Sequence, residues 1–359
     1  MRLQSLGIRD LRLFQQADIE AFGRLNLVYG PNASGKTTLL EAIYLLATAR
    51  SFRTPNLSEL MRHGSDCYQI RAKVSDAHGK TVALGLERTA QTLLLRAAGR
   101  KVQRASELAQ WLPVQIIHPD SHQLISGGPK SRRRFLDWGV FHVEPAFQGI
   151  WKRYDKALKQ RNAALKSRSF RVPINIWDPE LSEAATEIDR LRRRYVDEIK
   201  VILPEFIRAI MVKTGFDLHY YPGRSGNQSL QEELAHTLER DRRRGFTCSG
   251  PHRADLVFSS DGRPAAEVIS RGQQKMLVIA LFLAQAELLA RKTGQSGVLL
   301  FDDLAAELDQ SHRRRTLEAL QKMAVQVIIT ALDRNAIELP AGAETKLFHV
   351  EHGCIAEVI

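Results

Sequence analysis

The sequence predicts an α/β protein in which a mixed sheet with flanking helices is formed by both ends of the chain, with a helical arm lobe inserted between them. Two observations support this prediction. A glycine-rich loop at residues 30–38 lies between a strand-like and a helix-like run, and strand and helix patterns alternate again after Gly245. Such alternation is typical of parallel sheets. The residues in between have a mostly helical pattern and are rich in Arg and Lys. We therefore expect a head of residues 1–125 and 245–359 and an arm lobe of residues 126–244.

The glycine-rich loop has the spacing of a phosphate loop. Gly30, Gly35, Lys36 and Thr37 fit G-x-x-x-x-G-K-[ST]. In such loops backbone N–H groups surround a phosphate at the positive end of a helix, the lysine approaches the outer phosphates, and the threonine hydroxyl ligates Mg²⁺. The alternative, a glycine-rich turn that binds nothing, does not require the flanking strand and helix. The pattern predicts ATP binding by Gly30, Pro31, Asn32, Ala33, Ser34, Gly35, Lys36, Thr37 and Thr38.

Short strand patterns surround this loop. LQSLGIRDL and ADIEAF precede it, and YQIRAKVS, TVALGLER and TLLLRAAGR follow its helix. The alternation of apolar and polar residues predicts paired strands before the loop and a meander after it. The amino-terminal part of the head is therefore expected to be rich in sheet.

Composition favours a polyanionic partner. The chain of 359 residues has 52 Lys and Arg against 40 Asp and Glu, a formal net charge of +12. The three cysteines (Cys67, Cys248, Cys354) lie far apart without a C-x-x-C pair, which argues against a zinc site and for a reducing compartment. The amino terminus lacks the apolar run of a signal peptide, and the most apolar segment, 276–290, is too short to cross a membrane. We expect a soluble, cytoplasmic, nucleoid-associated protein with no membrane partner.

The arm lobe has two long helical patterns, expected to be antiparallel, with Pro173 and Pro179 marking the turn between them. Lys152, Lys156, Lys159 and Lys166 fall on one face of the first helix. A stripe of this kind is often only a solvated face. Two arginine clusters, at 132–134 and 192–194, and the overall charge favour phosphate contacts without base readout. The candidate DNA-binding residues are Arg132, Arg133, Arg134, Lys152, Lys156 and Lys159.

The segment GVLLFDD at 297–303 is an apolar run that ends in two carboxylates. A buried parallel strand that ends this way places the acids at the carboxyl edge of the sheet, where nucleotides bind. We expect Asp302 to partner Thr37 at Mg²⁺, directly or from the second coordination sphere, and Asp303 to polarise the attacking water. The alternative is that the two aspartates are merely solvated residues at the end of a strand. The presence of a phosphate loop in the same chain favours the magnesium site over this alternative.

The segment ISRGQQK at 269–275 opens the apolar helix, with Ser270 as a good helix N-cap. A simple cap followed by a polar turn would explain it. The segment also resembles the LSGGQ signature of ABC-type ATPases, and ELD at 307–309 resembles the D-loop that follows the acidic strand in that family. The resemblance adds Ser270, Arg271, Gly272 and Gln273 to the candidate ATP-binding residues, and Ser270 joins Lys36, Asp302 and Asp303 as a candidate catalytic residue.

One branch of these ATPases is more similar. GPHRADL at 250–256, GGPKSRRRFLDWGVFH at 127–142 and LKQRNAALK at 158–166 resemble the RecF family of bacterial DNA recombination and repair proteins, and the resemblance runs through nearly the whole chain. It implies an ABC-type head related to that of SMC proteins, and two copies that close on two ATP molecules. Ser270 and Gly272 would then contact the γ-phosphate held by Lys36 of the partner subunit. The resemblance also implies recognition of gapped or junction DNA, action with RecR and RecO, and loading of RecA onto single strands.

Two departures from the ABC-type pattern predict slow hydrolysis that depends on dimer formation. Many of these ATPases have Glu where Asp303 stands, and many have a histidine after the last buried strand, where this chain has Thr330, Ala331 and Asp333. We expect a weak, DNA-stimulated ATPase. The Q-loop position is open among Gln115, His118 and Asp120. An ATPase subunit of a transporter is an alternative, although the long basic lobe argues against it, and a scaffold that binds ATP without hydrolysing it is another.

Overall fold

The computed structural model describes residues 1–76, 79–167, 173–211, 215–225, 228–339 and 344–358. Contacts divide the chain into two compact units. We call them the head unit (Met1–Ser121, Glu205–Val212 and Lys275–Ile359) and the arm unit (His122–Pro204 and Lys213–Gln274). Each is described by itself below.

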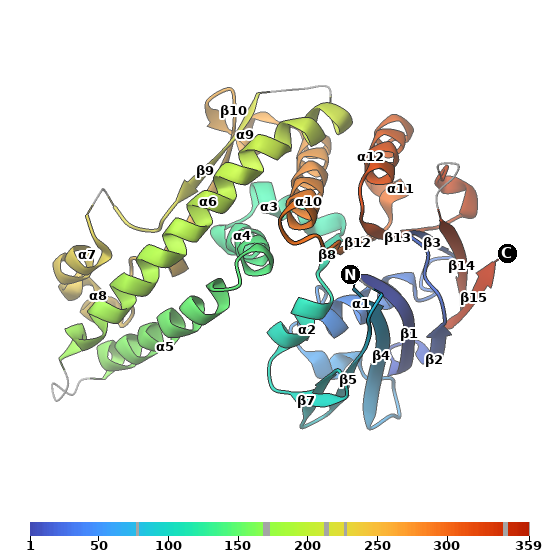
Figure 1. Ribbon diagram of the computed structural model, residues 1–359, viewed down its shortest axis with the longest axis horizontal. Coiled ribbons are helices and arrows are strands. Elements are labelled where there is room, and N and C mark those ends of the chain that lie inside the picture. Colours follow the sequence, from blue (N-terminus) through green and yellow to red (C-terminus); the bar gives the residue numbers. More distant parts are fainter. Residues whose placement is uncertain (77–78, 168–172, 212–214, 226–227, 340–343, 359) are drawn as a thin grey trace. The chain divides into compact units, whose positions relative to one another are not determined.

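The first sheet of the head unit has the order β15-β14-β3-β13-β12-β8. Its strands are β3 (Leu25–Tyr29), β8 (Val114–Ile117), β12 (Val298–Phe301), β13 (Gln326–Ala331), β14 (Thr345–Glu351) and β15 (Cys354–Val358). All neighbours pair in parallel except β14 with β15. Every residue of β8, β12 and β13 is buried, as expected for apolar strands covered on both faces. Figure 1 shows early and late parts of the chain side by side here, which confirms the mixed sheet formed by both ends.

The second sheet of the head unit is antiparallel, with the order β2-β1-β4-β5-β6-β7. Its strands are β1 (Arg2–Leu11), β2 (Phe14–Ile19), β4 (Cys67–Ser75), β5 (Thr81–Thr89), β6 (Leu93–Ala97) and β7 (Arg100–Val102). Burial alternates along them, so that one face is apolar and the other is solvated. Helix α1 (Lys36–Thr48) shares one hydrophobic core with residues of both sheets. The core therefore fixes the start of α1, where the phosphate loop ends.

The arm unit is mostly helical, as expected. Its longest helices are α4 (Pro129–Val143), α5 (Phe147–Lys166) and α6 (Asp178–Ile210), the last of which continues into the head unit beyond Pro204. Arg153 of α5 pairs with Glu180 and Glu183, and Arg161 pairs with Asp178. Later residues of α5 thus meet earlier residues of α6, so the two helices are antiparallel.

The remaining elements complete both units. The smaller helices and strands are η1 (Leu57–Leu60), α2 (Ala105–Trp111), η2 (Pro119–His122), α3 (Gln123–Ser126), η3 (Ile174–Trp177), β9 (Phe216–Tyr221), α7 (Leu230–His236), α8 (Leu238–Arg244), η4 (Pro251–Arg253), β10 (Asp255–Ser260), β11 (Arg263–Pro264), α9 (Ala265–Val268), α11 (Leu304–Glu307), α12 (Gln310–Lys322) and η5 (Arg334–Ala336). Helix α10 (Arg271–Thr293) begins in the arm unit and continues into the head unit.

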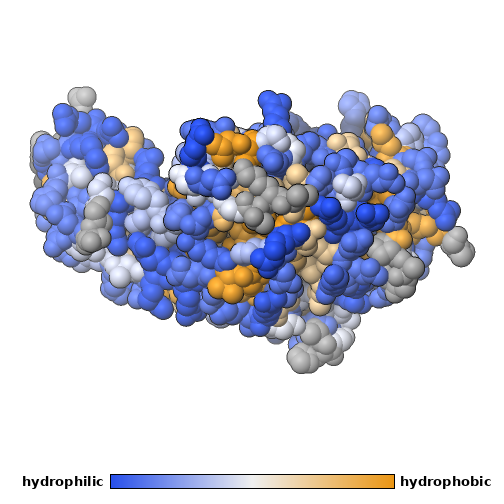
Figure 2. All heavy atoms as spheres, turned by 90° about the horizontal axis from the view of Figure 1, so that it is seen from above, coloured by the Kyte–Doolittle hydropathy of each residue, from blue (hydrophilic) through white to orange (hydrophobic). Residues whose placement is uncertain are grey.

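The contact division differs from the expected one after Gly245. Residues 245–274 group with the arm unit because β10 pairs along its length with β9, for example Val257 with His219. The sequence pattern showed a strand at β10 but could not show its partner. Polar residues cover most of the face shown in Figure 2, with small apolar areas between them. No helix within the described ranges is long and apolar enough to cross a membrane.

Candidate nucleotide-binding site

The parallel strands of the first sheet bring the predicted site residues to one edge. The phosphate loop follows β3, Asp302 and Asp303 follow β12, Thr330 lies near the end of β13, and His118 follows β8. Because β3, β13, β12 and β8 run in the same direction, their carboxyl ends share this edge.

The phosphate loop ends at Gly35, which has a left-handed φ of 120°. A Cβ atom there would lie 2.9 Å from Cζ of Phe14 in β2, so both the backbone angle and the close approach require glycine. The first bond within the helix runs from the Leu39 N–H to the Gly35 carbonyl at 2.9 Å. The N–H groups of Lys36, Thr37 and Thr38 therefore have no acceptor within the helix. A helix start of this kind attracts an anion.

Lys36 lies inside this loop. It is 8% exposed, and its Nζ donates to the carbonyl oxygens of Gly30 and Pro31, both at 2.8 Å. Burial lowers the pKa of its ammonium group, and the carboxylates of Asp303 and Asp302 oppose that shift. The Ser34 hydroxyl in the same loop is buried and has no hydrogen-bond partner in the part of the chain that the structure describes. The Lys36 ammonium group, the Ser34 hydroxyl and the N–H groups at the start of α1 are all hydrogen-bond donors, and such a set of donors suits the oxygens of a polyphosphate.

Asp302 contacts the first turn of α1. The Thr37 hydroxyl donates to its Oδ1 at 2.9 Å, although the two residues are 265 positions apart, and the Thr330 hydroxyl donates to the same oxygen at 3.1 Å. Burial raises the pKa of Asp302, and these two hydrogen bonds oppose the shift. A hydroxyl and a carboxylate in contact fit Mg²⁺, which prefers oxygen ligands and keeps positions for water and phosphate.

The position of Asp303 is fixed by its backbone conformation and by a hydrogen bond of its backbone N–H. It has a left-handed φ of 57°, and its N–H donates to the Thr330 hydroxyl at 2.8 Å. Its Oδ1 is buried without a hydrogen-bond partner among the described residues. Thr330 thus contacts both acids. The sequence did not indicate this role, because Thr330 was singled out only as one of the residues that stand where other ATPases have a histidine. The signal was its place at the end of a buried strand next to the acidic one.

The Q-loop candidates differ in their surroundings. Gln115 lies inside β8, 4% exposed, and its amide donates to Gln285 of α10, so it belongs to the core. The His118 ring lies 5.5 Å from that of Phe52, and burial raises the pKa of Asp302, a shift that a positive charge on His118 would oppose. Asp120 lies in η2. Of the three, the structure links His118 to the acidic edge.

The signature-like segment forms the predicted cap. The Gln273 N–H donates to Oγ of Ser270 at 3.2 Å, and the Ser270 N–H donates to Oε1 of Gln273 at 2.9 Å, a reciprocal capping box at the start of α10. Ser270, Arg271 and Gly272 are exposed. Lys275, near the start of α10, forms an ion pair that the sequence did not indicate. Its ammonium group lies 2.8 Å from the carboxylate of Glu307 in the D-loop-like segment.

The basic arm residues fall into two groups. Lys152, Lys156 and Lys159 are exposed along α5, as the helical spacing predicts, and Lys159 also pairs with Asp155 at 2.5 Å. Arg132 pairs with Asp255 at 2.6 Å, and Arg133 donates to the Ala254 carbonyl at 2.8 Å.

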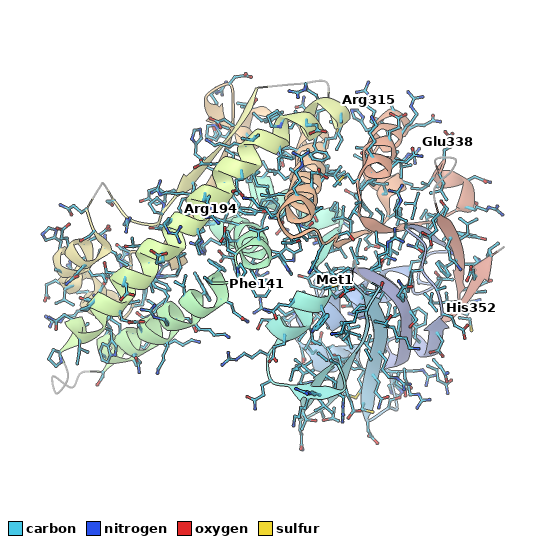
Figure 3. All side chains as sticks on the ribbon, in the orientation of Figure 1. Met1, Phe141, Arg194, Arg315, Glu338 and His352 are labelled. Atoms are coloured by element: carbon cyan, nitrogen blue, oxygen red, sulfur yellow. The ribbon has the colours of Figure 1, made fainter. Side chains whose placement is uncertain are left out.

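The two arginine clusters are therefore not uniform basic surfaces. Arg134 is exposed, but Arg192 is fully buried and lies 2.7 Å from Asp137. Arg194, labelled in Figure 3, pairs with Glu144. The acids that neutralise these arginines come from other elements, which the spacing of the arginines alone could not reveal.

Known proteins are similar in sequence to this chain over nearly its whole length. The family model described as RecF/RecN/SMC N terminal domain matches residues 2–356. A protein of Thioalkalivibrio sulfidiphilus (strain HL-EbGR7) named DNA replication and repair protein RecF is 42% identical over 356 residues, 99% of this chain and 99% of the relative. One of the same name from Pseudomonas entomophila (strain L48) is 40% identical over 361 residues, 99% of this chain and 98% of the relative.

Solved structures share the fold. A structure described as the recombination mediator protein RecF with ATP in the RecFOR pathway is similar with a TM-score of 0.88 at 25% identity, covering 99% of this chain and 97% of that chain. A crystal structure of an SMC head bound to the C-winged helix domain of ScpA has a TM-score of 0.60 at 14% identity, covering 100% and 98%, a likeness of fold alone. The fold is that of an ABC-type ATPase head with a helical insertion, as expected.

Proposed function

The chain belongs to the RecF/RecN/SMC N-terminal domain family, and from that premise we propose that it acts in DNA replication and repair as an ATP-dependent DNA clamp. The contact between Thr37 and Asp302 carries this proposal, because it joins a phosphate loop to an acidic strand end 265 residues away. The relatives named DNA replication and repair protein RecF supply the setting. The exposed lysines of α5 supply a surface for the phosphate backbone.

The site residues have separate roles in this proposal. The loop from Gly30 to Thr38 and the Lys36 ammonium would hold the phosphates of ATP. The N–H groups at the start of α1, which have no acceptor within the helix, and the buried Ser34 hydroxyl support this role. Thr37 and Asp302 would hold Mg²⁺, which neutralises charge that develops on the phosphates. The unpartnered Oδ1 of Asp303 would accept a proton of the attacking water. With these roles the protein would hydrolyse ATP slowly. Because DNA would favour the dimer in which the site is complete, DNA would stimulate the hydrolysis.

ATP would also assemble two copies. The exposed Ser270, Arg271 and Gly272 begin a helix whose N-terminus suits an anion, so that each copy could complete the site of the other. Binding of DNA and ATP is then coupled, because both favour the dimer. The further partners in this proposal are gapped or junction DNA, RecR, and downstream RecO and RecA, in a cytoplasmic setting close to the nucleoid.

Fluorescence anisotropy of a labelled gapped duplex tests the function. At one fixed salt concentration, we expect the protein to bind the duplex at least about tenfold more tightly with ATP and Mg²⁺ than with ADP, a coupling of about 1.4 kcal/mol. Equal affinity with both nucleotides would contradict the clamp and leave a constitutive DNA-binding surface.

Replacing Asp303 by asparagine separates the ATPase from a scaffold that only binds ATP. We expect Asp303→Asn to lower the rate of phosphate release about 100-fold, because a general base contributes roughly 10²–10⁴, while ATP affinity stays the same. Asp66→Asn, on an exposed aspartate just before β4, is the matched control and should hydrolyse normally. Equal turnover in both variants would show that the Asp303 carboxylate has no catalytic role, and an unchanged protein that releases no phosphate would favour the scaffold.

Replacing Lys152, Lys156 and Lys159 by glutamine tests the stripe on α5. Each phosphate contact contributes about 0.9 to the slope of log affinity against log salt, so we expect the slope to fall by about 2–3 and affinity to fall with it. The control is a variant with Arg314, Arg315 and Lys322 of α12 changed to glutamine, which removes the same charge from the head unit. If the two slopes match, the stripe is only a solvated face.

A further inference from the structure

The antiparallel sheet of the head unit has a solvated face rich in cations. The inward residues of its strands, such as Ile8, Ile70 and Leu84, are at most 2% exposed. Residues on the opposite side of the same strands are exposed or half-buried. We call this surface the basic sheet face; its cations are Arg9, Arg71, Lys73, Arg96 and Lys101.

The strand register aligns three of these cations, Arg71, Arg96 and Lys101, in one row across the sheet. Gly7 of β1 pairs with Arg71, Arg71 with Gly85, Gly85 with Arg96, and Arg96 with Lys101 of β7. Residues opposite each other in an antiparallel pair point to the same side. At a strand spacing of about 4.8 Å, the cations of the row, from Arg71 on β4 to Lys101 on β7, span about 14 Å. The row is therefore far longer than one phosphate group.

The cations of the basic sheet face are available to a partner. No hydrogen bond or ion pair joins their side chains to another part of the chain that the structure describes. The two carboxylates on this face accept from neutral glutamines of the same face: Asp18 accepts from Gln16 at 2.8 Å, and Glu87 accepts from Gln69 at 2.9 Å. Five cations against two carboxylates leave an excess of positive charge.

Small residues keep the face flat between the cations. Gly7 and Gly85 flank Arg71, and Ser5 and Ala83 flank Lys73. A hollow lies at the β1 side, lined among others by Gly7, Arg9, Arg71 and the carboxylate of Asp18. A long, flat ligand can thus approach the backbone and reach several cations at once.

We propose that the basic sheet face binds the sugar-phosphate backbone of duplex DNA, in addition to the stripe on α5. The inference rests on the proposed function, which it deepens by adding a second contact surface. The length of the row indicates a polymer of phosphates, since duplex DNA carries a charge about every 1.7 Å along its axis. None of the described residues on this face is aromatic, which disfavours stacking on single-stranded bases and anchoring in a lipid interface.

Gly85 gives the sharpest test, because it lies between Arg71 and Arg96. A Cβ atom there would lie 3.7 Å from the Arg96 Cβ, an ordinary contact, and the position is on the solvated face, so we expect a polar side chain to extend into solvent. In duplex binding with ATP, measured against salt, we expect Gly85→Glu to flatten the slope by about 1 and Gly85→Lys to steepen it by about 1, each relative to Gly85→Gln. Three equal slopes would overturn the inference.

A second variant removes the cations directly. With Arg71, Lys73 and Arg96 changed to glutamine, we expect the slope to fall by about 2.7, while ATP affinity and the melting temperature stay the same. The glutamine variant of α12 (Arg314, Arg315 and Lys322) is the control and should bind duplex like the unchanged protein.

The outcomes separate this inference from the proposed function. If the unchanged protein does not bind duplex more tightly with ATP than with ADP, the clamp fails first. If it does, but the variants of the basic sheet face match the α12 control, only the second surface fails. Binding to vesicles with phosphatidylserine that is lost in these variants while duplex binding is retained would identify the partner as a membrane, which also overturns the inference.

Discussion

Replacing Lys36 by alanine is expected to lower ATP affinity about 100-fold or more and to remove ATP-dependent DNA binding with it. The ammonium group lies buried inside the loop, donating to the Gly30 and Pro31 carbonyls at 2.8 Å. A hydrogen bond from a charged group contributes about 1.5–3 kcal/mol, and two such bonds to phosphates correspond to at least the 2.7 kcal/mol or so of a 100-fold change.

Isothermal titration with ATP and Mg²⁺ would measure this effect, followed by anisotropy of the gapped duplex. Lys322→Ala, on the exposed end of α12, is the matched control and should bind ATP normally. DNA binding by Lys36→Ala that still responds to ATP would show that the nucleotide acts somewhere other than the phosphate loop.

The second large effect concerns stability. Arg161 is fully buried in the arm unit, where it donates to Asp178 at 2.8 Å, to Asp241 at 2.8 Å and to the Thr247 hydroxyl at 2.9 Å. We expect Arg161→Leu to lower the free energy of unfolding by about 3–5 kcal/mol, because the change leaves buried carboxylates without a counter-charge.

Urea denaturation followed by circular dichroism would measure the loss. Arg153→Leu is the matched control, since Arg153 lies on the same helix and pairs with the exposed Glu180 and Glu183. It should cost at most about 1 kcal/mol. If the two variants were equally stable, the buried cluster would not hold the arm unit together. Changing Asp178 and Asp241 to asparagine in the Arg161→Leu background should recover part of the loss, because neutral amides need no counter-charge.

The sequence was a good guide wherever the relevant information was local. The spacing of Gly35, Lys36 and Thr37 predicts the turn at the start of α1, and the apolar run before Asp302 predicts a buried strand that ends at the same edge. The order of apolar runs also predicts a sheet formed by both chain ends. These features depend on neighbours in the chain, so a single sequence contains them.

The rest depends on contacts between distant segments. The spacing of Arg132 and Arg192 suggested basic surface, yet each has an aspartate partner from another element, Asp255 and Asp137. Arg71, Arg96 and Lys101 of the basic sheet face come from separate strands, so only the register shows that they form one row. Thr330 likewise gained a role only when β13 was placed beside β12.

The central strand of the first sheet sets a lower limit on when the protein can fold. Asn26 of β3 bonds to the Val327 carbonyl of β13, 301 residues later, and β14 on the other side of β3 is later still. At a synthesis rate of about 5–20 residues per second, β3 leaves the ribosome about 15–60 s before either neighbour exists. During that interval the antiparallel sheet can already support α1, but β3 has neither of its partners in the parallel sheet. The ATP site is therefore among the last parts of a nascent chain to form, and a chain that stops before β13 has a phosphate loop but no neighbours for the strand that supports it.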